Sequence, residues 1–153
     1  MSVPKRGLIT NRVITELNTS GFPVGDNSSP QDPYGWQGEP GASDSTFIPY
    51  LGVTPLAGSL QRTQDMRTSQ AEWVFPYSVW VAGISRMQSE ALADRVRGRL
   101  VAIAREVLED DFGNWKIQQI RCISIGNNTR VGSTFPDYYT QNDTFEVWVS
   151  KER

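Results

Sequence analysis

The most regular alternation of apolar and polar positions lies in the middle of the chain, over residues 72–85, EWVFPYSVWVAGIS. A period of two across residues 73–82 predicts a strand. One face carries Trp73, Phe75, Tyr77, Val79 and Val81, and the other carries Val74, Ser78, Trp80 and Ala82. Because both faces are largely apolar, we expect a central strand that is covered on both sides. Pro76 lacks an amide hydrogen, which predicts an edge or a bulge on one flank.

Two segments have the spacing of helices. The first covers residues 5–18 and is followed by the helix breakers Gly21 and Pro23. Its apolar side carries Leu8, Ile9, Val13 and Leu17.

The second helix follows the central strand directly. Its apolar positions recur every three or four residues, at Leu92, Val96, Leu100, Ile103 and Val107. Ser85 or Ser89 is the candidate N-cap, and Ser85 with Gln88 fits a capping box. We expect this helix to end near Asp110, with Gly113 just beyond it.

Three further segments are predicted to be extended: residues 47–53, 115–125 and 144–150. Polar connections separate them, at 54–71 and 126–143. The order of elements predicts an α+β fold with a small, mostly antiparallel sheet of about four strands, two helices and long inter-strand loops. We expect a single domain over residues 1–153. The pattern leaves open whether the two helices share one face of the sheet.

Residues 21–46 form a segment rich in glycine and proline, with nine such residues among 26 and no periodicity. Loops of this length inside a compact domain are usually functional or become ordered by a partner. Tyr34 and Trp36 lie in this loop or arm and need a surface to cover them. That surface is either the chain's own sheet or another molecule.

Composition and charge exclude several functions. The net charge is −2 and the sequence pI is about 5.2, which argues against broad nucleic-acid binding. The chain has no histidine and one cysteine, Cys122, so a common zinc site and a histidine-dependent triad are excluded. Cys122 is predicted to be a buried, inert thiol. We find no phosphate-binding or nucleophile-elbow motif, no signal peptide and no membrane span, and therefore expect no catalytic, cofactor or metal site and no membrane association.

The second predicted helix has an unusual order of charges. Arg95, Arg97, Arg99 and Arg105 precede Glu106, Glu109, Asp110 and Asp111. Acidic residues at a helix C-terminus are unfavourable by about 0.3–1 kcal/mol each. They indicate either compensation by cations of another chain or a screened, soluble surface. Gly98 lies inside the same helix, where it indicates either close approach of another backbone or a tolerated loss of stability.

The arrangement resembles the tail terminator proteins of long-tailed bacteriophages of the siphovirus type, especially those of actinobacterial hosts. The resemblance rests on LITNRV in the first helix, the Pro/Gly-rich segment, the strand ending in VAGIS, the helix opening SEALADRVR and two closing strands. It is strongest over residues 72–108. It is a likeness of layout, without a diagnostic motif.

The resemblance implies a structural virion protein and not an enzyme. Such a protein forms a ring, usually of six copies, at the head-proximal end of the tail after assembly in the host cytoplasm. The ring caps the tail tube, ends tube polymerisation and joins the head-side connector or stopper protein. DNA passes through its channel without specific binding.

Two sets of residues are candidates for contacts. The predicted subunit contacts are Tyr34, Trp36, Arg95, Arg97, Arg99, Glu106, Glu109 and Asp110. Loops that could face axial partners carry Arg62, Arg67, Phe135, Tyr138 and Tyr139. The alternatives are another head–tail connector, a tail tube subunit or, in a different class, a small α+β enzyme or ligand-binding domain with Tyr77 or Trp80 lining its pocket.

Overall fold

The computed structural model describes residues 4–19, 21–31, 33–39, 42–62, 71–132 and 138–152, with the backbone alone for 59–62 and 71. It contains helices α1 (Arg6–Asn18) and α2 (Arg86–Ala102). The strands are β1 (Val24–Asp26), β2 (Gly35–Gln37), β3 (Thr46–Ile48), β4 (Tyr50–Pro55), β5 (Ser59–Arg62), β6 (Ala71–Gly83), β7 (Val107–Asp110), β8 (Gly113–Ser124), β9 (Thr129–Val131) and β10 (Tyr138–Lys151).

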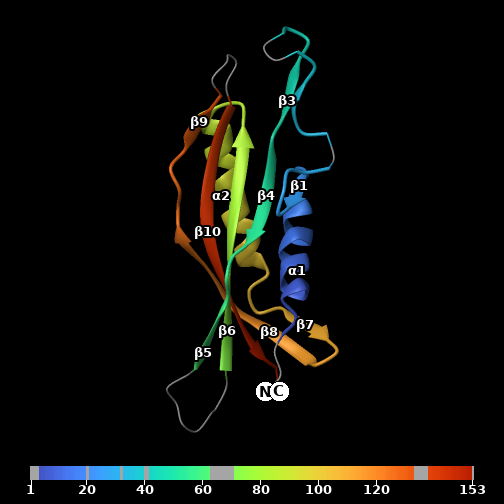
Figure 1. The fold of residues 1–153 in the computed structure, drawn as a ribbon, viewed down its shortest axis with the longest axis vertical. Coiled ribbons are helices and arrows are strands. Elements are labelled where there is room, and N and C mark those ends of the chain that lie inside the picture. Colours follow the sequence, from blue (N-terminus) through green and yellow to red (C-terminus); the bar gives the residue numbers. More distant parts are fainter. Residues whose placement is uncertain are drawn as a thin grey trace.

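Eight of the strands form one mixed sheet. Its main path runs in the order β1-β4-β6-β10-β8-β7, while β5 pairs with β6 and β9 with β10. The pairing of β1 with β4 is parallel and the other pairings are antiparallel. The two long strands β6 and β10 run side by side along the middle of the molecule (Figure 1).

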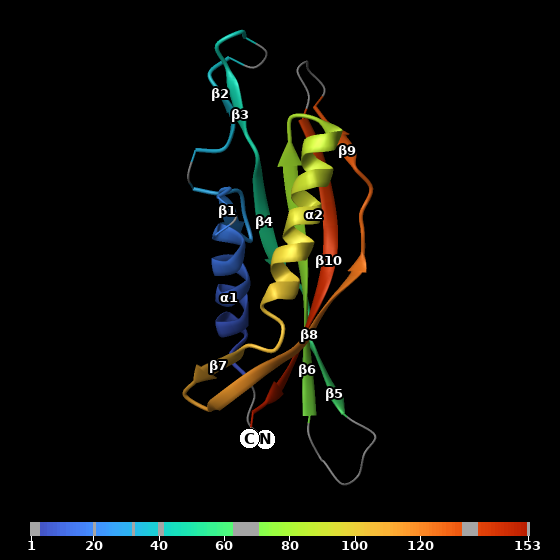
Figure 2. The same cartoon turned by 180° about the vertical axis from the view of Figure 1, so that it is seen from behind.

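Both helices lie on the same face of this sheet (Figure 2). Helix α2 contacts β6, β8 and β10, whereas α1 contacts α2 and also β1 and β7, the two ends of the strand path. A flat sheet could not bring both of its ends to one helix. The sheet is therefore curled around the helix pair. The sequence pattern had left open whether the two helices share one face, and the structure shows that they do.

The core lies between the helices and the inner face of the sheet. The predicted alternation in β6 is confirmed, because Phe75, Tyr77, Val79 and Val81 are buried in it. From β10, the apolar side chains in this core are Phe145, Val147 and Val149, again the predicted set. The Tyr77 hydroxyl lies 2.9 Å from that of Thr10 on α1, so its polar atom is satisfied inside the core.

Ser85 is the N-cap of α2, as predicted, but the reciprocal bond of the capping box goes to the amide of Ile84, one residue before the N-cap. The Ser85 hydroxyl accepts from the Gln88 amide at 3.1 Å, and Gln88 Oε1 accepts from the Ile84 amide at 2.7 Å. The prediction for Pro76 is also confirmed. On one flank of β6, β4 ends opposite Tyr77 and β5 begins opposite Val74, so Pro76 faces the gap between two partner strands.

The predicted end of the second helix is wrong. Helix α2 ends at Ala102, and residues 107–110 form the edge strand β7, paired with β8. Arg105 has a φ of 74°, a left-handed conformation that an α-helix cannot continue. Val107 fits the helical spacing but is exposed. All four acidic residues, Glu106, Glu109, Asp110 and Asp111, therefore lie outside the helix, and its dipole does not make them unfavourable.

The predicted number of strands is too low, although the α+β class and the two helices are confirmed. Strands β1 and β2 form within the Pro/Gly-rich segment, and β5 and β9 within the two connections. Strand β10 begins at Tyr138, six residues before the predicted start. The prediction for Cys122 is wrong as well, since this residue is exposed near the end of β8. Although the residue as a whole is exposed, neighbouring atoms partly desolvate the thiol and raise its pKa.

Candidate interaction surfaces

A β-hairpin projects from one end of the molecule (Figure 1). We call residues 33–48 the arm. Strands β2 and β3 pair antiparallel in it, with Trp36 opposite Phe47. The turn between them is held by backbone hydrogen bonds from Ala42 to Glu39 at 3.1 Å and from Ser45 to Ala42 at 3.0 Å. The Pro/Gly-rich segment thus supplies the first strand and the turn of a structured hairpin.

A chain of aromatic rings anchors the arm to the outer face of the sheet. The aromatic cluster consists of Tyr34, Trp36, Phe47, Tyr50, Trp80 and Tyr138. Ring centroids lie 5.6 Å apart for Trp36 and Phe47, 4.7 Å for Tyr34 and Tyr50, and 5.7 Å for Tyr50 and Trp80. Such edge-to-face pairs add about 0.5–1.5 kcal/mol each beyond the area that they bury.

The cluster unites residues that the sequence placed in separate sets. Tyr34 and Trp36, candidates for subunit contacts, share it with Tyr138, a candidate for an axial loop, which stacks on Phe47 at 6.3 Å. The covering surface for Tyr34 and Trp36 within this chain is their own hairpin and Tyr50. The indole nitrogen of Trp36 is buried and has no acceptor among the described residues.

Tyr50 is the buried centre of this cluster. Desolvation, with smaller contributions from Tyr138 and Tyr34, raises its pKa to about 12. The Tyr50 ring packs against the Trp80 ring, which also lies directly against Gly52 of β4. At Gly52, a Cβ atom would lie 2.2 Å from the Trp80 ring, so only glycine leaves room for this tryptophan.

The three arginines of the predicted contact set point away from α2 in different directions. Arg95 lies over the ring of Phe22, at 5.4 Å from its centroid, and is exposed. Arg97 pairs with Asp143 on β10 at 2.7 Å. Arg99 reaches α1, where its guanidinium lies 3.9 Å from Glu16.

The acidic members of the predicted set also make contacts within the chain. Glu106 receives two hydrogen bonds from Arg12, at 2.7 and 2.9 Å, and the bond to Glu106 is the main cause of a raised pKa of Arg12. Asp110 accepts from the Trp115 indole at 2.9 Å and from backbone amides. Desolvation opposes ionisation of Asp110, but these hydrogen bonds outweigh it and lower its pKa. Glu109 is exposed on β7.

The predicted axial residues are only partly described. Arg62 ends β5, opposite Ala71, and its side chain is outside the described part. Arg67 and Phe135 fall outside the described residues. Tyr139 is half-buried on β10, opposite Arg130 of β9.

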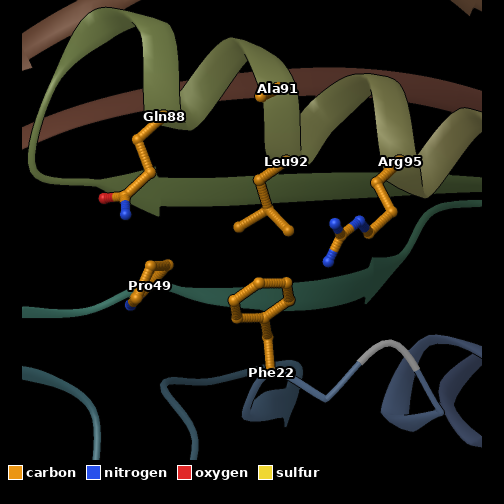
Figure 3. Close-up of a pocket in the computed structure, with 6 residues that line it drawn as sticks. All are labelled: Phe22, Pro49, Gln88, Ala91, Leu92 and Arg95. Carbon is orange, nitrogen blue, oxygen red and sulfur yellow. The ribbon is translucent and has the colours of Figure 1, made fainter.

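A cleft of about 120 Å³ lies between α2 and the base of the arm. Figure 3 shows Gln88, Leu92 and Arg95 of α2 pointing toward Pro49 and Phe22. We call it the Arg95 cleft; its lining residues are Phe22, Pro49, Gln88, Ala91, Leu92 and Arg95. The floor is apolar, and the polar groups at the rim are the guanidinium of Arg95 and the amide of Gln88. No carboxylate of the described residues lines it.

A second cleft, of about 330 Å³, lies between α2 and residues 125–128 and is lined mostly by polar groups. Neither cleft is lined by Tyr77 or Trp80, the residues of the ligand-binding alternative. Within the described residues, no three metal-ligating side chains lie close enough together to hold an ion. No helix in that same part is long and apolar enough to span a membrane.

Comparison with known proteins yields no match to any protein-family model and none among curated proteins. A solved structure does match, described as "Virion of native gene transfer agent (GTA) particle". One of its chains aligns with a TM-score of 0.57 and 16% identity, over 97% of this chain and 99% of that chain. The two chains share a fold.

The sequence did not indicate that Phe47, Tyr50 and Trp80 belong to the aromatic cluster, nor that Trp80 packs against Gly52. A local signal was present, since Phe47 and Tyr50 flank Pro49 in the stretch FIPY, directly after the arm. It also missed that Asp143 faces Arg97, because no local pattern connects residues 46 positions apart.

Proposed function

We propose that this chain is a structural virion protein of a phage-like particle. The observation that carries the proposal is the fold shared over nearly the full length of both chains with a chain from a virion. The resemblance of residues 72–108 to tail terminator proteins points independently toward the same class. The proposed role is therefore structural and not enzymatic.

Within that class, we propose the role of a tail terminator. The protein would form a ring of six copies at the head-proximal end of the tail, cap the tube protein, end its polymerisation and bind the head-side connector. DNA would pass through the ring without specific binding. A net charge of −2 supports this last point, because a strongly basic channel would retain phosphates.

The shape of the subunit fits a ring with two unlike partners. The arm projects at one end of the long axis, and the β5–β6 end lies at the other (Figure 1). A closed ring built from one chain needs two different surfaces that meet head to tail. Among the predicted contacts, Tyr34, Arg95 and Glu109 are exposed and Trp36 is half-buried. Arg97, Arg99, Glu106 and Asp110 pair with other residues of the same subunit.

The test is electron microscopy of the purified protein, alone and with preformed tail tubes. We expect rings with the mass of six 17.2 kDa chains, and tubes that stop growing once the protein is added. A tail tube subunit would extend the tubes instead, and a connector would form rings that leave tube growth unchanged. A monomer at high concentration that forms no ring on tubes would contradict the proposal.

A further inference from the structure

The charges of the chain are segregated between the arm and α2. No lysine or arginine occurs from residue 13 to residue 61, although this stretch contains five acidic residues. Two of them, Glu39 and Asp44, lie exposed at the turn of the arm. Helix α2 has the opposite balance, with four arginines and two acidic residues.

The arm carboxylates and Arg95 have no ionic partner within the part of the subunit that the structure describes. Among the described residues, no ion pair involves Glu39, Asp44 or Arg95, whereas Arg97 and Arg99 each contact a carboxylate. The arm also projects past the N-terminal end of α2, away from the body of its own chain (Figure 2). Its acidic turn is thus presented outward.

The arm is structured before any contact forms. The aromatic cluster joins β2 and β3 to Tyr50 and Tyr138, and backbone hydrogen bonds close the turn. A pre-ordered element loses less conformational entropy on binding than a flexible loop does. The buried indole N–H of Trp36 still lacks an acceptor among the described residues, which a second chain could supply.

The Arg95 cleft has the matching chemistry. Its apolar floor ends at two hydrogen-bond donors, the Arg95 guanidinium and the Gln88 side-chain amide, whose oxygen is already occupied by the Ile84 amide. Packing of Arg95 against Phe22 holds the guanidinium at the rim. A site with donors and no carboxylate favours an acidic segment.

We propose that the arm of one subunit docks, through Glu39 and Asp44 at its turn, on the Arg95 cleft of the next subunit. This inference rests on the proposed ring. The contact joins two different surfaces, so it repeats around a closed ring in one direction. It also makes the ring sensitive to salt, because exposed charge pairs are screened at high ionic strength.

The test uses charge reversal in the full chain. We expect Glu39→Lys with Asp44→Lys, or Arg95→Glu alone, to raise the protein concentration needed for ring formation roughly tenfold to a hundredfold. A 1:1 mixture of these two variants should recover rings, because arm lysines then face Glu at position 95 and native arm acids face Arg95 in alternating subunits. Glu152→Lys and Arg121→Glu, exposed and distant in sequence from both elements, are the matched controls and should assemble normally.

Assembly is measured by analytical ultracentrifugation and electron microscopy, with circular dichroism to verify that each variant folds. Recovery in the mixture of the two variants supports the proposal even if one variant is less stable alone. If the wild type forms rings and both variants do too, the arm contact is refuted while the ring remains. If the variants form rings but no longer bind tubes, the cleft serves an axial partner and the proposal is overturned. If the wild type forms no rings, both proposals fail.

Discussion

Arg97 on α2 donates through Nη1 to Oδ2 of Asp143 on β10 at 2.7 Å, and the Asp143 side chain is only 3% exposed. The other carboxylate oxygen accepts from the Gln141 side chain and from the Gly126 amide, both at 3.1 Å. The pair joins the helix layer to the central strand of the sheet. A buried carboxylate that loses its cation is costly, so this pair is a point of vulnerability in the fold.

We expect Arg97→Ala to lower the free energy of unfolding by about 2–4 kcal/mol, below the full value for a buried pair because Arg97 is 26% exposed. Urea denaturation measures the change. The control is Arg86→Ala, which removes an exposed pair with Glu90 at 3.9 Å and should cost less than about 0.5 kcal/mol. Equal effects of the two substitutions would contradict the structural role given to Arg97.

Two glycine-to-alanine substitutions should act in opposite directions. A Cβ at Gly52 would lie 2.2 Å from the Trp80 ring, so Gly52→Ala should destabilise the protein by about 1–3 kcal/mol and shift tryptophan fluorescence. A Cβ at Gly98 would meet no atom within 4 Å apart from the helix's own backbone, and alanine favours a helix over glycine by about 1 kcal/mol. Thermal unfolding should show a lower Tm for the first and a higher Tm for the second.

Removal of the N-cap of α2 should weaken the helix. Ser85→Ala deletes the acceptor for the Gln88 amide, and we expect a loss of about 1 kcal/mol. Ser43→Ala, at an exposed position in the arm, is the control and should be close to neutral. Chemical denaturation distinguishes the two, and an unchanged midpoint for Ser85→Ala would show that the capping bond contributes nothing.

The raised pKa of Tyr50 predicts a loss of stability in alkali. Its folded pKa of about 12 exceeds the ordinary value of 10.0, so the folded state favours the protonated phenol. The stabilisation that the protonated Tyr50 phenol gives to the folded state is fully present below pH 10. It is lost as the pH rises toward 12, because the unfolded chain releases this proton at a lower pH than the folded chain does. Tyrosinate absorbance should show a late-titrating tyrosine that disappears in Tyr50→Phe. A normal titration in both proteins would refute the burial of Tyr50.

The parts of the fold that follow from local rules were predictable. The face of β6, the start of α2 and the interruption at Pro76 each depend on residues close together in sequence. The end of α2 could not be predicted, because Val107 continues the helical spacing and the left-handed turn at Arg105 has no strong sequence signal. A hairpin signal was nevertheless present in Asp110 and Gly113, which suit the ends of a turn.

The short strands depend on their partners and not on their own pattern. Strand β1 becomes extended beside β4, and β9 beside the first residues of β10. The polar start of β10, around Gln141, has little intrinsic preference for a strand and pairs with β6 because the long central ladder continues through it. The interaction surfaces were predictable as residue types, but their pairing required the three-dimensional structure.

The central position of β10 has a consequence for the order of folding. This strand pairs with β6, β8 and β9, yet it follows all of them in the sequence. During synthesis, β6 therefore emerges with the edge that β10 will occupy still open, and the inner face of the sheet cannot close over α2 until residues 138–151 are available. An unpaired apolar strand is prone to aggregate. The nascent chain thus passes through an aggregation-prone interval that ends only when β10 pairs with both β6 and β8.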